Sequence, residues 1–70
     1  MKFANVIVDI SHEKFDRPFG YIIPDELEKE ITVGTAVIIP FGKGNRQIKG
    51  YVIEITDQPS FDISKMKEIM

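Results

Sequence analysis

Aromatic residues provide the clearest sign of binding chemistry in this sequence. Phe19 and Tyr21 flank Gly20, and Phe41 precedes a glycine-rich turn. Because residues two apart on a strand point to the same face, Phe19 and Tyr21 would form a platform on which a flat ring such as a nucleobase stacks. The plainer alternative is that both are core residues. Phe19 suits the core or a pocket wall equally well, whereas the polar tip of Tyr21 favours a half-exposed position.

A local group of basic residues accompanies the turn. Lys43, Arg46 and Lys49 lie around Gly42 and Gly44, two glycines that would let a ligand approach the backbone closely. Such a group could contact a phosphate backbone, although charges on a turn are more often simply solvated. The formal net charge of −2 argues against a protein that holds nucleic acid by bulk electrostatics.

Catalytic and metal-binding chemistry have little support. The single histidine, His12, has no cysteine or second histidine as a partner, and pairing it with Asp9 or Asp16 as a base is a weaker interpretation than a solvated loop. The carboxylates between Asp25 and Glu30 lack the glycine and the terminal glutamate of an EF-hand loop. The sequence therefore predicts no catalytic residue, no metal and no cofactor.

Alternating β-branched residues predict the strands that position these side chains. The expected strands cover residues 2–10, 19–23, 35–39 and 46–56. Residues 11–18 form a predicted loop, and residues 25–30 would begin a single helical turn after Pro24. Pro40 removes a ladder donor, so the third strand should end or reach a sheet edge there, before a hairpin turn over residues 41–45.

Two further segments carry less certain patterns. Gly50 lies inside the fourth predicted strand and indicates a β-bulge or the close approach of another chain segment. Residues 61–70 would form either one more short strand or an irregular tail. A strand is favoured, because Lys65, Lys67 and Ile69 alternate with a second set of residues, Met66, Glu68 and Met70.

These elements predict one all-β domain over residues 1–70, a small OB-like or SH3-like barrel of four to five short strands. With 43% hydrophobic residues and no cysteine in 70 residues, stability must come from closure of the sheet. No apolar stretch approaches the roughly 20 residues that cross a bilayer, and the start lacks a signal peptide. We therefore expect a cytoplasmic domain without a membrane partner, and a fragment of a longer protein because a predicted strand is still running at Met70.

Three runs of sequence carry a family pattern: RPFGYIIP (17–24), VGTAVIIPFG (33–42) and GYVI (50–53). The pattern is an aromatic-Asp-Tyr strand followed by two aliphatics and Pro, then Gly-x-x-Val-x-Val-Pro-Phe-Gly, then a basic turn leading to Gly-x-Val. In this order and spacing, essentially all 70 residues resemble the amino-terminal segment of the primosomal protein N′ (PriA) family of replication-restart helicases.

The resemblance implies a 3′ DNA-binding domain that captures the terminal nucleotide of a nascent leading strand at a replication fork. The domain itself would be a binding module, with the helicase motor, ATP hydrolysis and zinc binding of the family lying beyond Met70. The implied partners are the 3′ end of DNA, the rest of the helicase chain and other primosome proteins. Matched position by position, the implied site consists of Phe19, Gly20, Tyr21, Gly42 and Lys67, with Lys65 competing for the last role.

Gly20 departs from the family pattern, which has Asp at this position. No carboxylate is therefore available there to accept hydrogen bonds from the terminal nucleotide, and either the backbone of Gly20 or the nearby Asp16 would have to substitute. The alternative function is an SH3-like protein-interaction module without nucleic-acid binding, whose sheet edge near Pro40 pairs with a partner peptide. The two readings differ in whether Phe19, Tyr21, Gly42 and Lys67 converge on one small site.

Overall fold

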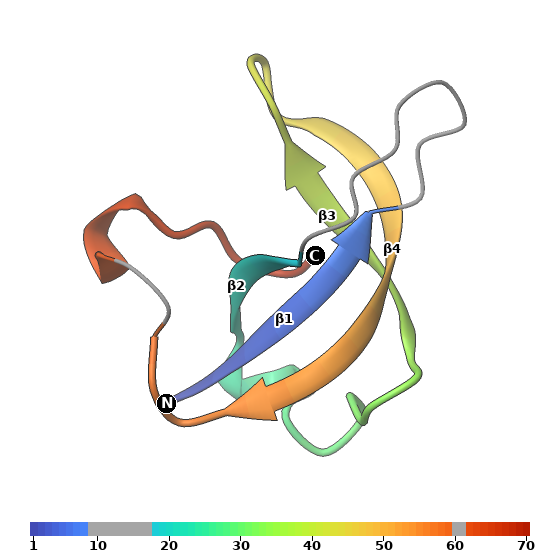
Figure 1. Cartoon of the computed structure of the whole chain (residues 1–70), viewed down its shortest axis with the longest axis vertical. Helices are drawn as coiled ribbons and strands as arrows, with labels where there is room; N and C mark the ends of the chain where they lie inside the picture. The colour runs from blue at the N-terminus through green and yellow to red at the C-terminus, as the bar shows by residue number, and fades with distance from the viewer. Residues whose placement is uncertain (9–17, 60–61) are drawn as a thin grey trace.

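The computed structural model describes residues 1–8, 18–59 and 62–70. In this part of the chain, four strands form one antiparallel sheet in the order β2-β1-β4-β3. They are β1 (Lys2–Val8), β2 (Phe19–Ile23), β3 (Ala36–Phe41) and β4 (Arg46–Thr56). The sheet is strongly curled, and the C-terminal end of the chain lies between its outer strands (Figure 1). The predicted all-β fold, a small OB-like barrel, is confirmed.

β1 shows why this sequence forms strands. Ala4, Val6 and Val8 are buried, whereas the residues between them, Asn5 and Ile7, are half-buried and face the other way. The predicted continuation of this strand over residues 9–10 lies outside the described residues, as do residues 11–17 of the predicted loop.

β3 is an outer strand, and it runs through Pro40 to Phe41. Proline is tolerated at a sheet edge because its missing N–H faces away from the neighbouring strand. Of the two outcomes expected at Pro40, the sheet edge is the one found. The turn predicted over residues 41–45 is found at residues 42–45, because Phe41 still belongs to β3. Gly42, Gly44 and Asn45 adopt positive φ values of 68°, 82° and 48° in it.

Gly50 lies where another strand comes very close. A Cβ atom built on it would be 2.5 Å from Cγ1 of Val6 and 2.9 Å from the carbonyl oxygen of Ile7. The predicted close approach is therefore found at Gly50 itself. The bulge lies further along β4, because Val6 pairs with Val52 while Asn5 pairs with Glu54, which leaves Ile53 as the extra residue.

The described residues also contain two short 3₁₀ helices, η1 (Asp25–Leu27) and η2 (Ile63–Lys65). η1 is the predicted helical turn after Pro24. η2 shows that the favoured strand over residues 61–70 is wrong, because the Asp62 carboxylate accepts a hydrogen bond from the Ser64 amide at 3.0 Å and caps a helical turn instead. Residues 66–70, which we call the tail, are irregular apart from a parallel bridge between Ile22 and Glu68.

The tail nevertheless closes the sheet. The amide of Ile22 donates to the carbonyl of Lys67 at 2.9 Å, and the amide of Ile69 donates back to the Ile22 carbonyl at 3.0 Å. On the other side, the amide of Met70 donates to the carbonyl of Ile38 in β3 at 2.9 Å. The tail is therefore bonded to both outer strands, β2 and β3, and fills the gap between them.

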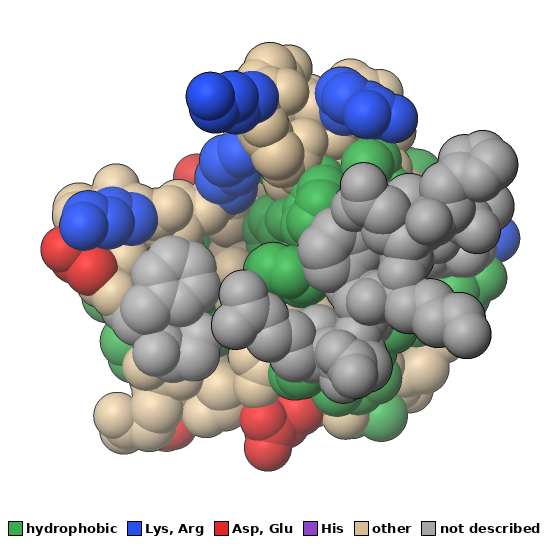
Figure 2. Space-filling model, turned by 45° about the horizontal axis from the view of Figure 1, so that its top comes forward, with side chains coloured by type: hydrophobic (Ala, Val, Ile, Leu, Met, Phe, Trp, Pro, Cys, Tyr) green, Lys and Arg blue, Asp and Glu red, His purple; other side chains and the backbone are tan. Residues whose placement is uncertain are grey.

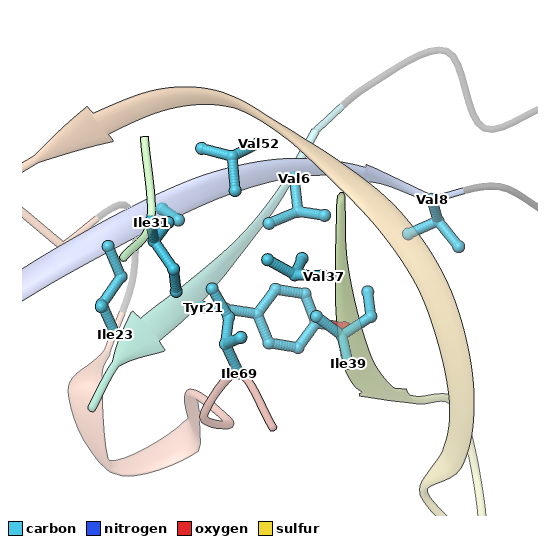
Figure 3. Close-up of a cluster of buried hydrophobic side chains, with 10 residues drawn as sticks. Val6, Val8, Tyr21, Ile23, Ile31, Val37, Ile39, Val52 and Ile69 are labelled. Carbon is cyan, nitrogen blue, oxygen red and sulfur yellow. The ribbon is translucent and has the colours of Figure 1, made fainter. Parts of the chain in front are cut away.

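The enclosed core is a cluster of buried apolar side chains drawn from every strand and from the tail (Figure 3). Its members are Ala4, Val6, Val8, Tyr21, Ile23, Ile31, Val37, Ile39, Val52 and Ile69. Ile69 is 2% exposed, so the tail contributes packing as well as hydrogen bonds to closure.

We expect Gly50→Ala to destabilise the domain by about 1–3 kcal/mol, because the new methyl group overlaps a backbone oxygen that cannot move alone. Gln47→Ala, at an exposed position of the same strand, is the matched control and should change stability by no more than about 0.5 kcal/mol. Urea unfolding measures both. Equal stability of the two variants would contradict the close approach of β1 to Gly50.

We also expect Ile69→Ala to lower the free energy of unfolding by about 2–5 kcal/mol, since it empties a fully enclosed position. Met70→Ala should have little effect, because that side chain is 56% exposed and the variant keeps the backbone bond to Ile38. Thermal and urea unfolding of the pair would test whether the tail is part of the core. A small loss in Ile69→Ala would show that the barrel is stable without it.

Candidate nucleic-acid interface

Tyr21 lies inside the barrel. Its side chain is 5% exposed, and its hydroxyl donates a hydrogen bond to the carbonyl of Pro40 at 2.9 Å. The ring extends through the core toward β3, with its oxygen beside Ile39 (Figure 3). The prediction that Tyr21 is half-exposed is therefore wrong. Its hydroxyl has a carbonyl partner within the fold, so burial does not leave this polar group without a hydrogen bond.

The surroundings keep this hydroxyl a donor. Burial raises the pKa of Tyr21 above its ordinary value of 10.0, because a poorly solvated site disfavours the phenolate. At neutral pH the hydroxyl is protonated, and the carbonyl of Pro40 can only accept. The direction of the hydrogen bond between β2 and β3 is therefore fixed.

Phe19, at the start of β2, packs against Phe41, at the end of β3. The two ring centroids are 5.1 Å apart and the ring planes meet at 85°, an edge-to-face arrangement. Both side chains are partly buried and pack against the core cluster. They form an aromatic wall at the end of the barrel where the outer strands approach each other.

Lys67 reaches this wall from the tail. Its ammonium nitrogen donates to the carbonyl of Gly42 at 3.2 Å, and its own carbonyl holds the Ile22 amide. Lys65 is the last residue of η2 and is exposed. Of the two lysines considered for the site, the structure brings Lys67 to the turn.

Three carbonyls at alternate positions along β3 and its turn accept hydrogen bonds from across the gap. The donors are the Met70 amide to Ile38, the Tyr21 hydroxyl to Pro40, and the Lys67 ammonium to Gly42. We call this row of three bonds the β3 seam. It begins with a backbone donor, continues with a part-buried hydroxyl and ends with an exposed ammonium, so its accessible end is at Gly42.

Gly42 lies at this accessible end with open space beside it. Its φ is +68°, a backbone conformation that residues other than glycine rarely adopt. A Cβ built there would meet no atom of the described chain within 4 Å. The turn therefore requires glycine for its backbone, and the same residue leaves room for a ligand next to the chain.

Arg46 and Lys43 lie near this end of the barrel. Arg46 is the cross-strand neighbour of Phe41, and such neighbours project from the same face of a sheet. Lys43 is exposed in the turn itself. Basic side chains gather around the β3–β4 hairpin beside deeper hydrophobic side chains (Figure 2).

Lys49 is separated from the other two basic residues. It lies three positions from Arg46 on β4 and therefore faces the opposite side of the sheet. Its ammonium nitrogen lies 5.4 Å from the centre of the Tyr51 ring. The predicted basic group is thus split, with Arg46 and Lys43 near the seam and Lys49 on the outer face.

Gly20 faces away from Phe19 and Tyr21, because strand residues alternate between faces. Its cross-strand neighbour is Asn5, whose side-chain amide donates a hydrogen bond to the carboxylate of Glu54. This polar pair was not identified from the sequence, since its members are 49 residues apart and neither belongs to a local motif.

The site therefore combines an aromatic wall, a glycine backbone with open space and a lysine that has N–H donors beyond the one given to Gly42. This combination suits a ligand that is both aromatic and anionic, as a nucleotide is. In residues 1–8, 18–59 and 62–70, no three His, Cys, Asp or Glu side chains are grouped to hold a metal. His12, Asp9 and Asp16 lie outside the described residues.

The same seam bears on the protein-interaction alternative. A peptide that adds to the edge of β3 needs its outward carbonyls, and those of Ile38 and Pro40 already accept hydrogen bonds from Met70 and Tyr21.

Within the described residues, no helix is long and apolar enough to cross a membrane.

Comparison with known proteins shows the family of this chain. Residues 5–70 match the model of a family described as the 3′ DNA-binding domain (3′BD) of PriA. The replication restart protein PriA of Bacillus subtilis (strain 168) is 44% identical over 69 residues, which are 99% of this chain and 8% of the relative. The chain thus spans less than a tenth of the length of this curated relative.

Proposed function

The chain belongs to the family of PriA 3′ DNA-binding domains, and from this premise we propose that it captures the terminal nucleotide at the 3′ end of a DNA strand. We further propose that it does so for the nascent leading strand at a replication fork, as one part of a longer replication-restart helicase. Other primosome proteins and the remainder of that helicase are the proposed partners, and the cytoplasm is the proposed location.

One observation supports this proposal most strongly. Phe19, Gly42 and Lys67 come from a strand, a turn and the tail, and the contacts between β2, β3 and the tail bring these segments to one end of the barrel. A site of this size suits one nucleotide better than a long strand. A DNA-binding surface that follows a continuous strand would instead need an extended basic groove, which conflicts with the net charge of −2.

Each group has a role in this proposal. The terminal base packs against the aromatic wall at Phe19, a contact worth about 1–3 kcal/mol when a base stacks on a ring. The Lys67 ammonium keeps its bond to Gly42 and donates its remaining protons to a phosphate oxygen. Gly42 lets the sugar approach the backbone. Lys43 and Arg46, which belong to the hairpin that contains Gly42, contact the next phosphate.

Selectivity for an end follows from the enclosed side of the site. Phe19, Phe41 and the seam form a wall behind the terminal sugar, so a continuing 3′ phosphodiester has no path through it. Gly20 provides no carboxylate to the nucleotide, and recognition of the terminal hydroxyl depends on backbone groups. Lys49 faces the other side of the sheet, so we exclude it from the contacts to this nucleotide.

We expect short single strands that end in a 3′ hydroxyl to bind at least about fivefold more tightly than the same strands with a 3′ phosphate, a difference of about 1 kcal/mol. Fluorescence anisotropy at low salt measures both affinities, with a 5′ phosphate as the control for added charge. With about two phosphates contacted, the slope of log affinity against log salt should be about −1.4. Equal affinity for the two 3′ ends would contradict end capture.

We expect Lys67→Ala to weaken binding of the 3′-hydroxyl strand about tenfold and to make the salt slope shallower by about 0.7, because one phosphate contact is lost. Lys65→Ala removes the same charge from an exposed position two residues away and serves as the matched control. It should change affinity by less than about twofold. Similar losses in both variants would indicate a diffuse charge effect and would count against a specific role for Lys67.

A further inference from the structure

The turn that carries Gly42 is held weakly by its own backbone. Within the turn, the Asn45 amide donates to the Gly42 carbonyl at 3.3 Å, which is beyond the usual range for a strong N–H···O bond. Gly42 and Gly44 also give this stretch unusual backbone freedom. The position of the turn relative to β2 therefore depends on contacts made from outside it.

The Tyr21 hydroxyl provides one such contact. It is bonded to the carbonyl of Pro40, two residues before Gly42, and it comes from the same strand as Phe19. This hydrogen bond consequently joins β2, which carries Phe19, to β3, which leads into the turn. The donor is part of a ring enclosed by the core, so it cannot follow the turn if the turn moves.

We propose that Tyr21 is a positioning residue of the DNA-end site: without touching the DNA, its hydroxyl sets the separation between Phe19 and Gly42. This inference rests on the proposed function. It gives Tyr21 a role different from the stacking platform expected from the sequence, since a side chain that is 5% exposed presents no face to a base.

The ring and the hydroxyl of Tyr21 have different roles, so the hydroxyl can be removed without changing the packing of the ring. The phenyl ring fills space in the core, and phenylalanine would fill the same space. The hydroxyl adds only the bond to Pro40. When it is absent, the Pro40 carbonyl lies in a part-buried place without that donor, and the strand end can shift to seek water. The Lys67 ammonium, at the exposed end of the seam, would shift with it.

Tyr21→Phe tests the proposal, and the chain offers a matched control because it has one other tyrosine. Tyr51 is 38% exposed on the outer face, so Tyr51→Phe removes a hydroxyl away from the seam. For the wild type and both variants, the ratio of affinities for 3′-hydroxyl and 3′-phosphate strands is measured by anisotropy. The backbone amide resonances of Phe41 and Gly42 are recorded in parallel without DNA, together with thermal unfolding.

In Tyr21→Phe we expect the preference for the 3′ hydroxyl to fall roughly fivefold, the change that one neutral hydrogen bond supports. The Phe41 and Gly42 amide resonances should move while the variant stays folded, and Tyr51→Phe should match the wild type in both respects. A positioning role is overturned if Tyr21→Phe keeps the full preference, if both variants lose it equally, or if Tyr21→Phe unfolds, since the hydroxyl would then hold the whole barrel.

The proposed function and the positioning role of Tyr21 would be contradicted by different results. Absence of end preference in the wild type contradicts the proposed function itself, and the positioning role falls with it. Preference in the wild type that survives in Tyr21→Phe contradicts only the role of Tyr21. The amide resonances add an independent reading, because they report the position of the turn without DNA.

Discussion

Closure of the sheet is the constraint on which the rest of this small domain depends. β2 and β3 are the outer strands of a four-stranded sheet, and each would expose unpaired backbone groups if the sheet stayed open. The tail bonds to both of them at Ile22 and Ile38 and buries Ile69 in the gap. Without disulfides to assist, the same few residues complete both the hydrogen bonding of the edges and the core.

The candidate site is a consequence of how that closure ends. Near Ile38 the seam uses a backbone donor of the tail, whereas at Pro40 and Gly42 the donors are the side chains of Tyr21 and Lys67. The barrel therefore has an end where the aromatic wall, an open glycine and a lysine ammonium lie together. A DNA-end domain needs a small, partly enclosed place of this kind, and it does not need the strongly basic surface of a groove-binding protein.

Local patterns were enough to predict the strands, the edge at Pro40 and the glycine turn, because alternation and turn chemistry act over a few residues. The tail was predicted wrongly, since the Asp62 cap outweighs the alternation that follows it. The aromatic strand and the glycine turn were identified from residue types, whereas Lys67 came from the family resemblance. The choice between a core and a half-exposed position for Tyr21 could not be made from the sequence, because its hydrogen-bond partner lies 19 residues away. The alternation of faces along β4 alone would have placed Lys49 and Arg46 on opposite sides of the sheet.

A titration of the isotopically labelled domain with a short strand that ends in a 3′ hydroxyl, followed through the backbone amide resonances, tests whether the DNA end binds at the open end of the β3 seam. We expect the largest changes at Phe19–Tyr21, at the turn over residues 42–45 and at Lys67, with little change on the outer face around Tyr51. Changes centred on Lys49 and Tyr51, or spread evenly over the surface, would contradict a DNA-end site at the open end of the β3 seam.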